Sequence, residues 1–187
     1  PLSCVLHAFD LVGSVAGRSV LVYGAGTMGL LTTTVARLGG ASTIDVVDLR
    51  EEKLAAAASV GSDRVSTSAS ALGSDPRWDV VVDATGALAA ITDGLSRVDR
   101  GGTFLQLGVS SPEAVVDVRP FRVYDDELRI IGSVCPADCF PRAVVHVQDV
   151  GLPVDAIVSD RIPLADFEQA LRRFAGGGTR KGGVVPS

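Results

Sequence analysis

The chain has 187 residues, of which 47% are hydrophobic and 21% are charged. This composition is typical of one soluble globular domain or slightly more, and it excludes disordered and fibrous proteins. The 17 basic and 22 acidic side chains give a formal net charge of −5 without any block of basic residues, which argues against nucleic acid as a partner.

Strand and helix patterns alternate through the first 133 residues, as is typical of a parallel sheet covered by helices. The sequence predicts six strands, at residues 19–23, 42–47, 64–66, 79–83, 103–107 and 128–131. Helices are expected from about Thr27 to the Gly39-Gly40 pair, over 51–60 and over 88–98. Only about a dozen residues join the third strand to the fourth, so the helix there must be short or missing. The fold class is therefore α/β, a doubly wound Rossmann fold with a six-stranded parallel sheet.

The pattern changes beyond Ser133. We expect a helix over 140–150, a strand over 155–158, a helix over 164–174 and a last strand at Val184-Val185. This strand-helix-strand tail is not part of the six-stranded sheet.

A glycine-rich turn, Gly24-Ala25-Gly26-Thr27-Met28-Gly29, has the form G-x-G-x-x-G. It lies between the first predicted strand and its helix, and an acid, Asp48, follows 19 residues after the last glycine at the end of the next strand. This combination is typical of a dinucleotide-binding site.

Each glycine of the turn has a predicted role. Gly24 permits the tight turn, Gly26 leaves room for a pyrophosphate, and Gly29 lets the helix pack close to the sheet. Thr27 and Met28 would contribute main-chain donors, since a helix N-terminus offers unpaired N–H groups to phosphates.

The carboxylate of Asp48 favours NAD over NADP, because it accepts hydrogen bonds from the ribose hydroxyls and repels a 2′-phosphate. Arg50 favours NADP, since an arginine near this position can receive that phosphate. S-adenosylmethionine and flavin also use such turns, and a glycine turn without any ligand is a further alternative.

Further motifs follow in order along the chain: PLSCVLHA at 1–8, VVDATG at 81–86, RGGT at 100–103, IIGS at 130–133, IPL at 162–164 and FEQA at 167–170. With the GAGTMG turn, these segments resemble the cofactor-binding half of the zinc-containing alcohol dehydrogenases, the medium-chain dehydrogenase family. They are most similar to its sorbitol or polyol dehydrogenase branch.

The resemblance implies roles for residues at matching positions. Asp48 and Lys53 would hold the adenosine ribose, and Thr85 would lie beside the adenine. At the other end of the cofactor, the residues expected around the nicotinamide are Leu107, Gly108, Val109, Ser133 and Val134.

The resemblance also implies the division of the chain. Residues 1–13 would form a connecting helix, 14–134 the NAD-binding Rossmann domain, and 135–187 a tail that returns to a GroES-like catalytic domain. The catalytic zinc of the family is bound in that other domain by Cys, His and Glu, so we expect neither catalytic nor metal-binding residues here. The chain opens on proline, and we expect it to be part of a larger protein and inactive alone.

The expected whole protein is a zinc-dependent dehydrogenase that transfers a hydride from a secondary alcohol or polyol to NAD. One alternative is a zinc-independent NADPH quinone reductase of the same superfamily. The other is a non-catalytic NAD-binding module.

The remaining features carry simpler interpretations. Cys4, Cys135 and Cys139 are an odd number of cysteines, which indicates isolated thiols and a cytoplasmic protein. His7 is expected to be a packed structural histidine, and the run 125–127 a solvated turn.

Two further expectations concern membranes and assembly. The uncharged stretch 19–36 contains three glycines, so it predicts two short elements and no membrane helix. A β-like run at 114–118, with the sixth strand, is expected at the interface of a homodimer or homotetramer, since family members pair their sheets there.

Overall fold

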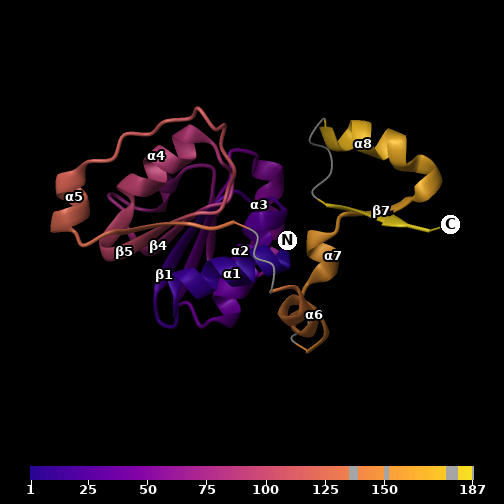
Figure 1. Ribbon diagram of the computed structural model, residues 1–187, viewed down its shortest axis with the longest axis horizontal. Coiled ribbons are helices and arrows are strands. Elements are labelled where there is room, and N and C mark those ends of the chain that lie inside the picture. Colours follow the sequence, from indigo (N-terminus) through magenta and orange to yellow (C-terminus); the bar gives the residue numbers. More distant parts are fainter. Residues whose placement is uncertain (135–138, 150–151, 176–180, 187) are drawn as a thin grey trace.

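The computed structural model describes residues 1–134, 139–149, 152–175 and 181–186. Its centre is a six-stranded, wholly parallel sheet in the order β3-β2-β1-β4-β5-β6, with helices on both faces (Figure 1). The order reverses between β1 and β4, which is the point where open α/β sheets bind their ligands. The predicted Rossmann fold is therefore confirmed.

The elements of this sheet follow one another along the chain as predicted, with helices between most strands. Their bounds are α1 Leu2–Val12, β1 Ser19–Tyr23, α2 Thr27–Leu38, β2 Thr43–Val47, α3 Glu51–Ser59, β3 Arg64–Ser66, the 3-10 helix η1 Ala69–Leu72, β4 Trp78–Asp83, α4 Leu88–Ser96, β5 Val98–Gln106, α5 Pro120–Asp125 and β6 Arg129–Gly132.

The central strands are apolar on both faces because helices cover both. In β1, Val20 and Val22 pack with α1, α2 and α3, whereas Leu21 and Tyr23 face the opposite core with Ile91 of α4. All four strand residues are buried. This two-sided burial explains why the strands read as continuous hydrophobic runs in the sequence.

The tail contains the elements α6 Phe140–Asp149, α7 Val154–Ile157, β7 Asp160–Pro163, the 3-10 helix η2 Leu164–Asp166, α8 Phe167–Ala175 and β8 Gly182–Val185. Strands β7 and β8 pair in parallel to form a small sheet of their own, with α8 between them in the chain. None of the helices in the described ranges combines the length and apolar composition needed to cross a membrane.

Three predicted strands need correction. The strand expected over 155–158 is wrong: a single helical turn, α7, follows Pro153 there and buries Ile157 against the main core. Residues 114–118 form no strand, since they pair with none of the strands that the structure describes. Strand β5 begins at Val98 instead of 103, because the Arg100-Gly101-Gly102 segment is a bulge within the strand and not a turn before it.

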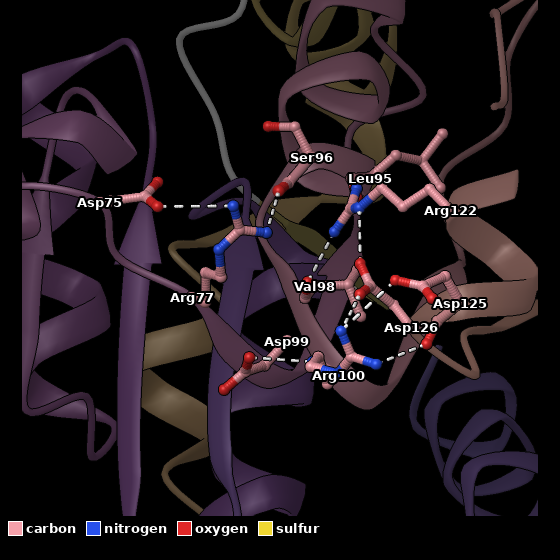
Figure 2. A network of polar contacts seen from close by, with 10 residues as sticks. All are labelled: Asp75, Arg77, Leu95, Ser96, Val98, Asp99, Arg100, Arg122, Asp125 and Asp126. Atoms are coloured by element: carbon pink, nitrogen blue, oxygen red, sulfur yellow. Dashed lines mark hydrogen bonds and ion pairs between the residues drawn. The ribbon is translucent and has the colours of Figure 1, made fainter.

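The acidic run before β6 includes the turn that we expected, at 126–127, with Asp125 and Glu127 exposed, but Asp125 and Asp126 also form ion pairs. The Asp126 carboxylate pairs with Arg122 through Oδ2 at 3.1 Å and with Arg100 through Oδ1 at 3.2 Å, and Arg100 also reaches Asp125 (Figure 2). Arg122 donates in addition to the Val98 carbonyl at 2.7 Å. These contacts attach α5 to the bulged start of β5.

A partly buried carboxylate, Asp79 of the central strand β4, holds the start of β1 to the sheet. Its Oδ2 accepts hydrogen bonds from the amide and the hydroxyl of Ser19, each at 2.7 Å, and Arg18 donates to its carbonyl at 3.0 Å. Partial burial works to raise the pKa of Asp79, but the bonds from Ser19 and the charge of Arg18 outweigh it and hold that pKa below its ordinary value.

We expect Asp79→Asn to lower the free energy of unfolding by about 1–2 kcal/mol at pH 7, because charged hydrogen bonds are lost. A depressed carboxyl pKa stabilises the fold above the unfolded-state pKa of about 3.9, and that stabilisation disappears as the pH falls through the folded-state value. Urea unfolding at pH 7 and at pH 3 should therefore show that the difference in unfolding free energy between the native chain and the variant is smaller at pH 3. A difference in unfolding free energy that is the same at both pH values would contradict this role of Asp79. So would the same pH-dependent difference in the control variant Asp117→Asn, which alters an exposed carboxylate.

Candidate functional site

A cavity of about 400 Å³ opens at the carboxyl ends of β1, β2 and β4, beside the point where the strand order reverses. Its lining is mostly apolar, with a few polar side chains, as is usual for a site that binds a small molecule. The lining residues come from the strand ends, the loop at 67–69 and α4: Tyr23, Gly24, Val47, Asp48, Leu49, Arg50, Thr67, Ser68, Ala69, Thr85, Ala87, Ala89, Ala90 and Asp93.

The three glycines of the turn between β1 and α2 differ in what the fold demands of them. Gly24 has φ +102°, which side chains disfavour, and a Cβ there would lie 2.9 Å from Thr85 Cγ2. A Cβ at Gly29 would overlap the carbonyl oxygen of Gly24. Gly26 is different: its φ of −82° suits any residue, and a Cβ would meet no atom within 4 Å. The fold itself thus needs Gly24 and Gly29 but not Gly26.

Helix α2 starts directly behind this turn. Gly26 is its N-cap, no side chain caps the first turn, and the first turn holds no acid. Leu30 donates the first intrahelical bond, to the Gly26 carbonyl at 2.9 Å. The positive end of the helix dipole therefore points at the space over Gly26, where it would attract an anion.

The Asp48 carboxylate lies between the turn and the cavity. Its Oδ2 accepts a hydrogen bond from the Ala25 amide at 2.8 Å, and its Oδ1 accepts one from the Arg50 amide at 2.9 Å. Each carboxylate oxygen can accept more than one hydrogen bond, so both retain capacity toward a ligand in the cavity. Asp48 thus braces the glycine turn while it lines the cavity.

Tyr23 and Asp93 form a polar contact inside the cavity. The Tyr23 hydroxyl donates to Asp93 Oδ2 at 2.6 Å, and Arg97 holds the other carboxylate oxygen at 3.2 Å. Burial, with the hydrogen bond to Asp93, raises the pKa of Tyr23 far above its ordinary value. Tyr23 therefore stays a neutral phenol that orients Asp93, and it is no acid or base near neutral pH.

A second carboxylate, Asp83 at the end of β4, is wholly buried. Oδ1 accepts from the Thr85 amide at 3.0 Å and from the Thr85 hydroxyl at 2.6 Å; Oδ2 accepts from the Gly86 amide at 2.9 Å and from Gln106 Nε2 at 2.7 Å. Gln106 also donates to the Gly108 carbonyl at 2.6 Å. One buried carboxylate thus joins the loops that follow β4 and β5.

The residues expected around a nicotinamide follow these same strand ends. Leu107 is buried, Val109 is 91% exposed, and a Cβ at Gly108 would overlap the Gly86 amide nitrogen. The Ser133 amide donates to the Gln106 carbonyl at 3.1 Å, so Ser133 lies next to Leu107 at the carboxyl edge of the sheet. Its hydroxyl oxygen is buried without a hydrogen-bond partner among the described residues.

The structure does not gather all of the predicted residues in one place. Thr85 lines the cavity with Asp48, but Lys53 lies in α3 and is not among the lining residues. Thr27 and Met28 begin α2, where Met28 also packs against the core. Cys135, one of the three cysteines considered, lies outside the described residues.

Sequence reasoning missed four functional candidates: Tyr23, Asp83, Asp93 and Gln106. A polar side chain at the carboxyl end of an otherwise apolar strand could have indicated Asp83 and Tyr23. The sequence does not mark Asp93 or Gln106 as part of a site, because the partners that place them there, Tyr23 and Asp83, are 70 and 23 positions away in the chain.

Comparisons with known proteins agree with this geometry. The model of the family described as zinc-binding dehydrogenase matches residues 27–149. A D-arabinitol dehydrogenase of Uromyces fabae is 29% identical over 198 aligned positions, which cover 100% of this chain and 57% of that protein. A D-altritol 5-dehydrogenase of Agrobacterium fabrum is 31% identical over 172 positions, or 89% of this chain and 51% of that protein.

Solved structures include a protein from Sinorhizobium meliloti described as a zinc-binding dehydrogenase and crystallised with NADP. Its sequence is 31% identical, and the two structures superpose with a TM-score of 0.91. The matched region covers 100% of this chain and 57% of the S. meliloti chain. The chain thus spans about half the length of the curated relatives that it matches.

Proposed function

Because this chain belongs to the zinc-binding dehydrogenase family, we propose that it is the dinucleotide-binding part of a dehydrogenase that oxidises a secondary alcohol or polyol. The relatives that act on arabinitol and altritol support a polyol as the substrate class. The cofactor that we propose is NAD.

The single observation that carries the proposal is the open space over Gly26. Neither strain nor packing requires a glycine there, yet the position lacks a side chain beside the N-terminus of α2, where the positive end of the helix dipole attracts an anion. A pyrophosphate on those groups accounts for this glycine, and a turn without a ligand does not.

The bound dinucleotide supplies a nicotinamide ring that accepts the hydride. The chain's own residues position it: the α2 N-terminus binds the pyrophosphate, Asp48 holds the adenosine ribose, and the loops joined by Asp83 support the nicotinamide end. Thr85 would flank the adenine and Lys53 would assist Asp48. The residues that we assign to the dinucleotide site offer no thiolate or imidazole, so we propose that the catalytic zinc of the whole protein is held by residues outside this chain.

Asp48 is expected to select NAD. We predict that the native chain binds NAD at least about tenfold more tightly than NADP, since the carboxylate accepts hydrogen bonds from the ribose and repels a 2′-phosphate. Asp48→Ala should weaken NAD binding and bring the two affinities close together, whereas exposed Asp75→Ala should change neither. Isothermal titration with both dinucleotides measures this.

NADP is the second candidate cofactor, because the S. meliloti relative was crystallised with it and Arg50 lies two residues from Asp48. In that case NADP would bind more tightly than NAD, and Arg50→Ala would weaken NADP alone. Absence of binding by either dinucleotide would contradict the proposed function itself.

We further propose a cytoplasmic homodimer or homotetramer. The outer edge of β6 lacks a neighbouring strand among the described residues, and Ile130 in that strand is 47% exposed. Pairing of two such edges would cover them, since an open apolar edge otherwise promotes aggregation. Cys4 and Cys139 are free thiols, which favours a reducing compartment.

A further inference from the structure

Three side chains with metal-binding atoms meet where α1 contacts α6, away from the dinucleotide cavity. His7 and Asp10 lie on α1, three residues apart and hence on one face of the helix. Cys139 stands just before α6, 129 positions after Asp10. The imidazole nitrogen, the carboxylate oxygen and the thiol sulfur all lie within 4.8 Å of one another.

These three groups suit one class of ion. Zinc and chemically similar divalent cations take thiolate, imidazole and carboxylate ligands together at roughly 2.0–2.3 Å. Two ligands of one tetrahedral ion at such distances lie roughly 3.5 Å apart, so side-chain adjustments of about 1 Å would complete the site. Magnesium and calcium are disfavoured, since they prefer oxygen ligands only.

The surroundings leave the site accessible. His7 and Cys139 are half-buried and Asp10 is exposed. A hollow of about 550 Å³ adjoins them, lined by Leu6, Phe9, Asp10, Gly13, Arg142 and His146. A cation can therefore enter from solvent, and a water molecule can fill a fourth ligand position.

Arg142 bears on the affinity in two ways. Its Nη2 donates to Asp10 Oδ2 at 2.7 Å, which orients the carboxylate and leaves Oδ1 for a metal, as partners of metal ligands commonly do. Its positive charge also repels a cation. We therefore expect micromolar affinity and not the tight binding of a closed structural zinc site.

We propose that His7, Asp10 and Cys139 bind one zinc-class divalent cation, which fastens the start of α6 to α1. The site consists of residues of this chain alone, and it neither requires nor excludes a dinucleotide. It revises our sequence-based interpretation of Cys139 as an isolated thiol and His7 as a purely structural histidine.

Titration of the whole, chelator-treated chain with Zn²⁺ and with Co²⁺ tests the proposal. We expect one equivalent of either ion to bind, with a thiolate-to-cobalt charge-transfer absorption for Co²⁺. Cys139→Ser should abolish that absorption and weaken Zn²⁺ binding at least tenfold, and Asp10→Asn, at an exposed position, should weaken it without disturbing the fold. NAD titration of each variant reports separately on the dinucleotide site.

The matched control is Cys4→Ser, which removes a free thiol from α1 outside the cluster. It should leave the stoichiometry, the absorption and the affinity unchanged. The proposal is overturned if no equivalent binds at millimolar metal, if Cys4→Ser has the effect expected of Cys139→Ser, or if Asp10→Asn binds Zn²⁺ as the native chain does.

Discussion

Gly26→Ala is expected to weaken NAD binding by roughly 10- to 100-fold, which corresponds to the loss of about one charged hydrogen bond to phosphate. The added methyl group would stand where the pyrophosphate approaches the first N–H groups of α2. The free energy of unfolding should change by less than about 1 kcal/mol, because the reduced freedom of the unfolded chain and the poorer N-cap oppose each other. Titration calorimetry and urea unfolding of the same preparation measure the two effects.

Two further glycine variants make this prediction specific. Gly29→Ala should reduce the stability by about 1–3 kcal/mol or more, since its Cβ would overlap the Gly24 carbonyl oxygen. Gly73→Ala should change neither binding nor stability appreciably, because its Cβ would make only ordinary contacts with Pro76. A Gly26→Ala chain that binds NAD as tightly as the native chain would remove the main support for a pyrophosphate at this turn.

Asp83→Ala is expected to lower the free energy of unfolding by about 2–4 kcal/mol. The substitution removes the acceptor of the partly buried Gly86 amide and one of the two acceptors of Gln106 Nε2, which keeps the Gly108 carbonyl; each unpaired group costs about 1–3 kcal/mol. The loops after β4 and β5 would also lose their common anchor, so NAD affinity should fall although Asp83 itself need not touch the cofactor. Urea unfolding and NAD titration measure the two losses.

Smaller changes distinguish the anchor from a general loss of charge. Gln106→Leu removes only the link between Asp83 and Gly108, so it should affect NAD affinity more than stability. Asp99→Asn alters an exposed carboxylate that accepts a hydrogen bond from the neighbouring Arg100 amide, and it should have little effect. If Asp83→Ala were as stable as Asp99→Asn, the buried carboxylate would not be the anchor of these loops.

Most of the fold was predictable because its signals are local. The apolar runs at β1 and β4 and the stop at Gly39-Gly40 appear within a few residues and were confirmed. The errors arose where tertiary contacts override local preference. The β-branched residues around Asp155 favour a strand, but burial of Ile157 in the main core, where α7 contacts α2 and α3, selects the helical turn.

The sequence by itself determined the glycine turn, the acid that follows it and the parallel sheet that presents both, since these depend on short-range geometry and on the periodicity of apolar residues. Only the tertiary structure decided that Tyr23 holds Asp93, that Asp83 joins two loops, and that His7 and Asp10 meet Cys139. Such partners are far apart in the chain, and no local pattern encodes a distance that arises only when the helices pack.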